Sequence, residues 1–289
     1  MSMSSNPLPE HDQSMADPSP MAYIDNAPSS GVIAPSESVP PPPAATFPEW
    51  SWWDAVAVLV STVFAVFLFS IIALAIVRTI PKYQRIPVAD LATDPRIVVG
   101  AQSAAYPVIL VLIFVLVRSR THQRFGDAIH WNWPGISAPG FFVAGSVLAL
   151  IVEGLSNFLP IPKSLPMDNY FHNESSAYLL AAFGITLAPL LEELFFRGML
   201  YPLARRAFGL AIAVLVTAAA FAAIHGAQLG YAWSPILSIF VVGVVFTVTR
   251  ARADSVAASF LMHCGYNFAL FAMLWLASDH YRHLERVAN

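Results

Sequence analysis

The stretch AYLLAAFGITLAPLLEELFFRG (residues 177–198) joins an apolar run of bilayer length to two adjacent carboxylates and an arginine. About 20 consecutive apolar residues in a helix are enough to cross the hydrocarbon core of a membrane. A charged side chain at that depth costs about 2.5–3.5 kcal/mol on insertion scales and is by default a functional candidate. The stretch therefore predicts a transmembrane helix that carries a polar site.

Apolar runs of similar length recur along the chain from residue 55 onward, separated by short polar joints. Only helices and closed barrels satisfy the backbone inside lipid, and these runs lack the two-residue alternation of a barrel strand. The pattern predicts an all-α, polytopic transmembrane helical bundle of about seven spans, within a range of six to eight. The expected spans are Ala55–Val77, Ile97–Val117, Ala138–Phe158, Ala177–Phe196, Gly209–His225, Trp233–Val248 and Val256–Ala277.

The composition of the chain excludes several classes of protein. Of its 289 residues, 57% are hydrophobic and 11% are charged, with a formal net charge of -3. Ordinary soluble domains have about 25% charged residues, so we expect the partner of this surface to be the lipid bilayer. The charge balance offers no electrostatic basis for binding nucleic acid. Cys264 is the only cysteine, so an internal disulfide is excluded.

Changes in composition divide the chain into four parts. Residues 1–50 are rich in proline and serine, contain no lysine or arginine, and predict a disordered tail. Residues 51–176 are expected to form N-terminal transmembrane helices, and residues 177–277 a helical core that carries the polar site. Residues 278–289 are a short polar tail. We expect a multi-pass protein of the cell membrane, with Trp50, Trp52 and Trp53 in an interfacial aromatic belt. Lysine and arginine divide equally between the two faces, so the positive-inside rule assigns no orientation.

Two carboxylates of the first stretch have different prospects for pairing. Glu193 and Arg197 are four residues apart with the acid first, which is the favoured order for an ion pair within a helix. Glu192 is left without a local partner. It is therefore the candidate for a general base, whereas Glu193 and Arg197 are candidates for a supporting role.

A histidine in the next span is expected at the depth of these carboxylates. If the fourth helix continues to a turn at Phe208-Gly209, Glu193 lies sixteen residues before the turn and His225 sixteen residues after it. At 1.5 Å per residue, both lie about 24 Å from the turn. Phe221, four residues before His225, is expected on the same helix face.

The last span adds two more polar residues at a helical spacing. His263 and Asn267 are four residues apart and share one helix face. Counted from the basic joint that precedes this span, they lie roughly 15–20 Å along the helix axis, near the depth of Glu192. We therefore expect Glu192, His225, His263 and Asn267 to converge inside the bundle.

These residues resemble the three motifs of the CPBP family of intramembrane proteases. That family is related to type II CAAX prenyl endopeptidases and to bacterial immunity (Abi) proteins. The resembling motifs are E-E-x-x-x-R at residues 192–197, F-x-x-x-H at residues 221–225 and H-x-x-x-N at residues 263–267. The resemblance covers roughly residues 177–275 and does not extend to the other spans or the tail.

The resemblance implies an intramembrane endopeptidase that hydrolyses a peptide bond of a membrane-associated protein, with prenylated CAAX-type proteins as one substrate class. Glu192 and His225 would activate water, and His263 and Asn267 would stabilise the oxyanion. Family members are often described as metalloproteases, and Glu192, His225 and His263 would suit a zinc ion. The chain has no H-E-x-x-H motif, and the nearby Arg197 disfavours a cation. A metal-free mechanism is therefore the favoured interpretation, with zinc as the alternative.

Two other functions stay open at this point. The intramembrane glutamates and histidines could form a proton or metal relay in a transporter, although we see no inverted repeat. The protein could instead be a catalytically idle membrane scaffold, acting as an immunity or secretion factor. A substitution of Glu192 separates the protease from the scaffold.

Overall fold

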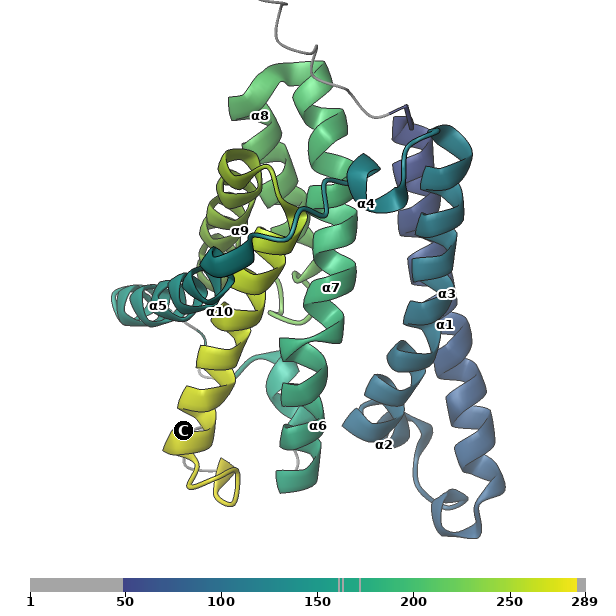
Figure 1. The fold of residues 1–289 in the computed structure, drawn as a ribbon. Coiled ribbons are helices and arrows are strands. Elements are labelled where there is room, and N and C mark those ends of the chain that lie inside the picture. Colours follow the sequence, from purple (N-terminus) through teal and green to yellow (C-terminus); the bar gives the residue numbers. More distant parts are fainter. Residues whose placement is uncertain (1–48, 161, 163, 172, 285–289) are drawn as a thin grey trace, which may run out of the picture. The chain divides into compact units, whose positions relative to one another are not determined.

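The computed structural model describes residues 49–160, 162, 164–171 and 173–284, and within these ranges the regular structure is helical throughout (Figure 1). The predicted tail, apart from residues 49 and 50, lies outside the described residues. The longer elements are α1 (Trp52–Thr79), α3 (Pro95–Arg120), α5 (Ala138–Ser156), α6 (Glu174–Ile185), α7 (Leu187–Glu193), η4 (Leu194–Leu200), α8 (Tyr201–Ile224), α9 (Trp233–Ala253) and α10 (Val256–Ala277). The short helices are η1 (Pro81–Tyr83), α2 (Val88–Ala92), α4 (Phe125–Ala128), η2 (Gly135–Ser137) and η3 (Pro166–Tyr170).

Six helices among the described residues are long and apolar enough to cross a membrane. One of them runs for 51 residues, Glu174–Ile224, and as a straight rod it would be more than twice as long as the bilayer is thick. Gly209 interrupts it with φ 76° and ψ 178°, a conformation open to glycine. The chain folds back on itself within α8 (Figure 1), so the 51-residue helix corresponds to the two predicted spans Ala177–Phe196 and Gly209–His225. The predicted all-α bundle and its turn at Gly209 are confirmed.

The tryptophans before α1 do not all lie in an interfacial belt. Trp53 is 81% exposed, as an interfacial residue should be. Trp50 is 1% exposed, and its indole Nε1 donates a hydrogen bond to the Met199 carbonyl at 3.2 Å. The belt prediction for Trp50 is therefore wrong, because a carbonyl of the distant η4 segment satisfies its only polar group.

The predicted span Ala177–Phe196 is not one continuous α-helix. Thr186, with φ −121° and ψ −70°, separates α6 from α7. Pro189 has no N–H and its ring crowds the carbonyl four residues earlier, which explains a break at this point. Beyond α7, residues Leu194–Leu200 wind into a π-helix, η4. π-Helical segments are rare and occur often at functional sites.

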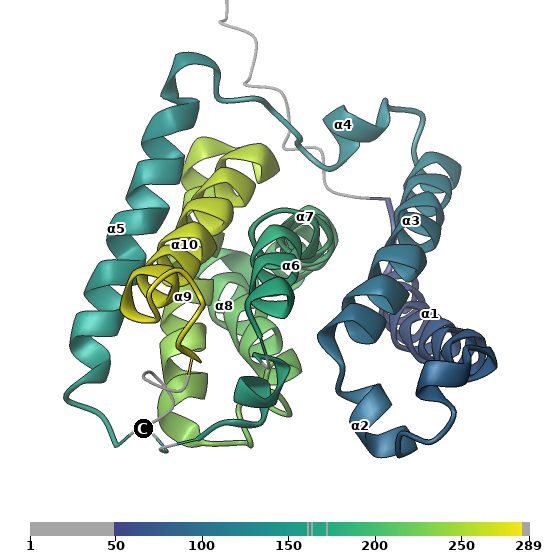
Figure 2. The same cartoon turned by 90° about the horizontal axis from the view of Figure 1, so that it is seen from below.

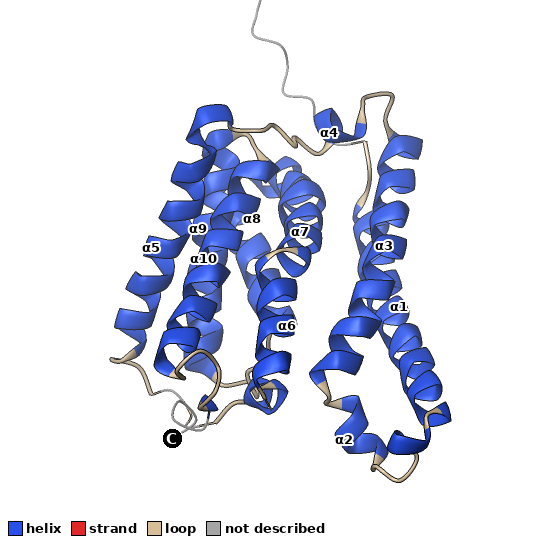
Figure 3. Ribbon diagram, turned by 60° about the horizontal axis from the view of Figure 1, so that its bottom comes forward, coloured by secondary structure: helices blue, strands red, loops and turns tan. Residues whose placement is uncertain are grey.

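Three apolar clusters hold the described part of the bundle together, and two of them position the elements of the site. The first joins α1 and α3 to α7, η4 and α8, with Ile109, Ile113, Leu194 and Met199 among its buried members. The second lies between α5, α9 and α10 and is centred on Phe246. Figures 2 and 3 show α5 lying along α10 on one side of the bundle and α1 pairing with α3 on the other.

Helices α5 and α10 approach so closely that their backbones touch. A Cβ atom on Gly145 would overlap the Met262 carbonyl, and one on Gly265 would overlap the Phe142 carbonyl. Ser146 Oγ donates a hydrogen bond to the Gly265 carbonyl at 2.9 Å across the same contact. Small residues at such a crossing are the usual means of close helix packing in lipid. This contact fixes α10, which carries His263 and Asn267.

Candidate active site

The ion pair expected from the spacing of Glu193 and Arg197 forms in the centre of the bundle. Arg197 Nη1 lies 2.9 Å from Glu193 Oε1, and both side chains are fully buried. Arg197 also donates to the Gly243 carbonyl at 3.1 Å and to Thr247 Oγ1 at 3.4 Å. Its guanidinium carbon lies 4.5 Å from the centroid of the Phe221 ring. The arginine thus ties η4 to both α8 and α9.

Two residues of α10 complete the environment of Glu193. Ser259 Oγ donates to Glu193 Oε2 at 2.6 Å, and His263 Nδ1 lies 2.9 Å from Glu193 Oε1. Together with Arg197, these contacts occupy both carboxylate oxygens. The sequence analysis missed Ser259, although it stands four residues before His263 and shares one helix face with it.

Glu192 has a different environment from its neighbour. Its Oε2 lies 3.7 Å from His263 Nε2, and its side chain keeps 20% of its surface exposed. Within the described part of the chain, no hydrogen bond to the Glu192 carboxylate is shorter than this 3.7 Å contact with His263. His263 therefore lies between two glutamates, one bonded to its Nδ1 and one facing its Nε2. The Glu192 carboxylate is left with oxygens available for a water or a substrate.

His225 lies at the end of α8 and is connected to the other residues through Phe221. Its Nδ1 lies 2.8 Å from the Phe221 carbonyl. Because a carbonyl can only accept, Nδ1 carries the proton in this hydrogen bond, and Nε2 of the neutral ring is then an acceptor. The Phe221 ring centroid lies 4.9 Å from the His225 ring and 5.7 Å from the His263 ring. Phe221 and His225 thus share a face, as expected, and the Phe221 ring contacts both imidazoles.

Asn267 is held by the segment beside the break between α6 and α7. Its Nδ2 donates to the Gly184 carbonyl at 2.7 Å, which leaves its second N–H available. Among the four predicted catalytic residues, Glu192 and His263 are in direct contact. His225 and Asn267 are each anchored by a backbone carbonyl, of Phe221 and Gly184 respectively.

The donor set does not form a metal centre as it stands. In the ranges that the structure describes, no three His, Cys, Asp or Glu side chains are arranged to hold a metal ion. Both oxygens of Glu193 and the Nδ1 atoms of both histidines are engaged by protein groups. These contacts leave the Nε2 atoms of both histidines available, but within the described ranges these atoms and the Glu192 carboxylate are not arranged to hold one ion. The residues as they lie therefore do not fit a resident zinc.

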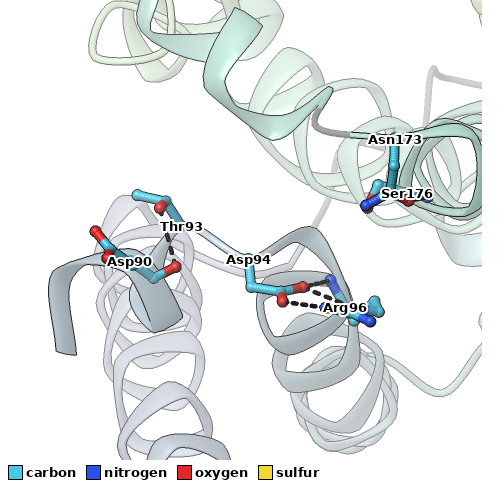
Figure 4. A pocket seen from close by; sticks show the side chains of 6 residues that line it. All are labelled: Asp90, Thr93, Asp94, Arg96, Asn173 and Ser176. Carbon is cyan, nitrogen blue, oxygen red and sulfur yellow. Dashed lines mark hydrogen bonds and ion pairs between the residues drawn. The ribbon is translucent and has the colours of Figure 1, made fainter. Parts of the chain in front are cut away.

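A separate polar hollow of about 270 Å³ lies between the start of α3 and the start of α6 (Figure 4). Asp94 and Arg96 on its wall form an ion pair at 2.6 Å. Asn173 caps α6 by accepting from the Ser176 amide at 3.0 Å. These groups satisfy one another locally, and the hollow contains none of the residues of the candidate site.

Comparison with known proteins supports the resemblance drawn from the motifs. Residues 174–269 match the family model described as Type II CAAX prenyl endopeptidase Rce1-like. This segment runs from α6 into α10 and includes Glu192, Arg197, His225, His263 and Asn267. No curated protein and no solved structure matches the chain. The expected family is thereby confirmed for this segment, and the chain is an integral, multi-pass membrane protein.

Proposed function

We propose that the protein is an intramembrane endopeptidase that hydrolyses a peptide bond with a water molecule activated by Glu192. The observation that carries the proposal is the contrast between the two adjacent glutamates. Glu193 is saturated by Arg197, Ser259 and His263, whereas Glu192 faces His263 with its carboxylate otherwise unbonded. A general base needs an unoccupied lone pair aimed at the reacting proton.

The reaction divides among the residues as follows. Glu192 accepts a proton from the water while the water oxygen bonds to the carbonyl carbon of the scissile peptide. The proton then passes to the leaving nitrogen as the carbon–nitrogen bond breaks, which yields a carboxylic acid and an amine. His225 Nε2 is an acceptor because Nδ1 donates to the Phe221 carbonyl, and it assists in orienting the water. Positioned donors aimed at the developing oxyanion supply a large part of the barrier reduction.

His263 and Asn267 are the candidates for those donors. Because His263 Nδ1 bonds to Glu193, donation from Nε2 requires the doubly protonated ring. The carboxylates of Glu193 and Glu192 lie 2.9 Å from Nδ1 and 3.7 Å from Nε2 of this ring. Asn267 has a second amide N–H beyond the one given to the Gly184 carbonyl. Both donors come from one face of α10, so their spacing is fixed by the helix.

The family match supports a membrane-associated substrate, and we propose prenylated CAAX-type proteins of the cell membrane as its class. A farnesylated peptide ending in Cys-aliphatic-aliphatic-X, incubated with the full-length protein in detergent, tests this directly. We expect cleavage after the modified cysteine, read by mass spectrometry, and weaker cleavage of the same peptide without the lipid. Absence of cleavage of both peptides would refute the activity.

Metal dependence is tested in the same assay. We propose that hydrolysis proceeds without a bound metal, because no three His, Cys, Asp or Glu side chains among the described residues are arranged to hold one. Cleavage that persists in a strong chelator, with substoichiometric zinc by elemental analysis, is the expected result. Loss of cleavage in chelator and its restoration by zinc would replace this mechanism with a zinc-dependent one.

A further inference from the structure

The end of the bundle at which α9 meets α10 is rich in arginine. Figure 1 shows the turn within α8, the α9–α10 junction and α4 in the same half of the bundle. Trp52 contacts Phe208 at 6.1 Å between ring centroids, and Asn132 Nδ2 donates to the Asp254 carbonyl at 2.7 Å, which ties these segments to one another. The charged residues here are Arg118, Arg120, Arg124, Arg205, Arg206, Arg250 and Arg252, against Glu49, Asp54, Asp127 and Asp254.

Two of these arginines gather around one buried tyrosine. The guanidinium carbons of Arg205 and Arg250 lie 6.0 and 5.6 Å from the centroid of the Tyr201 ring, which is 1% exposed. Arg205 Nη1 also donates to the Tyr201 hydroxyl at 3.2 Å. Arg205 stands four residues before the Gly209 turn and Arg250 three residues before the end of α9. At 1.5 Å per residue, both lie within about 6 Å of a helix end, at the level of lipid headgroups.

Arg205 and Arg250 together carry more positive charge than the carboxylate beside them neutralises. Arg250 is 2% exposed and pairs with Asp254 at 2.9 Å, but Asp254 also contacts His130 at 3.1 Å. The Nε atom of Arg250 is buried without an acceptor in the described part of the chain. Arg205 is exposed, and its other N–H groups have no protein acceptor among the described residues. Asp254 therefore pairs with both Arg250 and His130, and no ion pair of Arg205 is found among the described residues.

We propose that Arg205 and Arg250, arranged around Tyr201, form a binding site for the phosphate group of an anionic phospholipid. The exposed guanidinium of Arg205 is the direct ligand, because its planar fork matches two phosphate oxygens. Arg250 lies beneath it as the second positive charge. Basic pockets between transmembrane helices at the headgroup level are typical of such sites. The assignment is independent of the proposed peptidase activity.

Native mass spectrometry of the full-length protein with phosphatidylglycerol or phosphatidylcholine tests this site. We expect the wild type to retain one phosphatidylglycerol, and Arg205→Gln to weaken that binding about tenfold, as for loss of a charge-assisted hydrogen-bonding group. Arg205→Lys keeps the charge without the fork and should weaken it as well. Arg124→Gln is the matched control, because it removes an exposed arginine from the same end of the bundle and should leave the bound lipid in place.

Three outcomes would overturn the proposal. Equal retention of phosphatidylcholine would show that the phosphatidylglycerol headgroup is not selected. An equal loss in Arg124→Gln and Arg205→Gln would show that only the overall charge of the face matters. Stabilisation by inorganic phosphate alone, to the same melting temperature as with phosphatidylglycerol, would assign the site to a small anion instead of a lipid. Matching melting profiles of the variants in phosphatidylcholine verify that each one is folded.

Discussion

Glu193 accepts a hydrogen bond from His263 inside the bundle, with 2.9 Å between Oε1 and Nδ1 and side chains that are 0% and 5% exposed. The contact joins α7 to α10 and turns the Nε2 atom of the same ring toward Glu192. A carboxylate that holds one nitrogen of a histidine fixes the orientation of the ring and which nitrogen is available for chemistry. The second glutamate of the pair thus acts by positioning His263.

Removing the positive partner of Glu193 should destabilise the protein severely. Arg197→Ala leaves a fully buried carboxylate without its ion pair, and loss of one partner from such a pair costs about 3–5 kcal/mol. We expect a sharply lower melting temperature or a lower yield of folded protein in detergent. Arg85→Ala, which removes an exposed arginine, is the control. If Arg197→Ala melted like the wild type, the pair would not support the fold.

The hydroxyl of Ser259 should contribute measurably to the same network. Ser259→Ala removes the donor to Glu193 Oε2, and a hydrogen bond to a charged group contributes about 1.5–3 kcal/mol. We predict a lower melting temperature than in Ser119→Ala, whose exposed hydroxyl bonds only to the Leu116 carbonyl of its own helix. Equal melting of the two variants would mean that Ser259 is not needed to hold the carboxylate.

The close crossing of α5 and α10 should not tolerate an added methyl group. Gly145→Ala places a Cβ against the Met262 carbonyl, and overpacking of this kind costs about 1–3 kcal/mol. Gly154→Ala in the same helix meets no atom within 4 Å and should be neutral or slightly stabilising. Thermal unfolding of both variants separates packing from helix propensity. A stable Gly145→Ala protein would contradict the observed helix contact.

The contacts of Asp254 predict a dependence of stability on pH. Burial tends to raise the pKa of Asp254, but the Arg250 hydrogen bond and the His130 charge outweigh it and hold the pKa below its usual 3.8. The stabilisation is therefore present above pH 3.8 and disappears as the pH falls through the lower, folded-state value. Asp254→Asn keeps the left-handed backbone at φ 47°, which asparagine also adopts.

The difference in melting temperature between wild type and Asp254→Asn should accordingly be present near neutral pH and vanish in acid. A difference that stayed constant from neutral pH to below pH 3.8 would show that ionisation of Asp254 does not stabilise the junction.

Hydropathy predicted the helices well because each helix depends on the apolar run and the capping residues within its own stretch of sequence. The predicted span Val256–Ala277 matches α10 at both ends, since Ser255 caps its first turn and the apolar run ends where the helix ends. The break at Thr186 had a readable signal in Pro189. The π-helix at Leu194–Leu200 had none, because its residues are as apolar as those of an α-helix. The burial of Trp50 depends on a carbonyl 149 residues away, which no local pattern reveals.

Helix periodicity placed the polar residues at a common depth, but it could not assign their partners. The ion pair of Glu193 and Arg197 follows from a four-residue spacing, and the structure contains it. Which glutamate faces which nitrogen of His263 depends on the rotation of α7 against α10, set by packing across the bundle. For that reason the contact between Glu192 and His263, and the contact of the Phe221 ring with His263, appear only in the structure.

The central claim is that Glu192, and not Glu193, activates the attacking water, and its most direct test is the Glu192→Gln variant. Purified wild type and variant should be compared for cleavage of the farnesylated peptide, with melting temperature as the measure of folding. Because glutamine cannot accept the proton, we predict wild-type melting together with a loss of about 10²–10⁴-fold in kcat. Cleavage by Glu192→Gln at the wild-type rate would contradict the account.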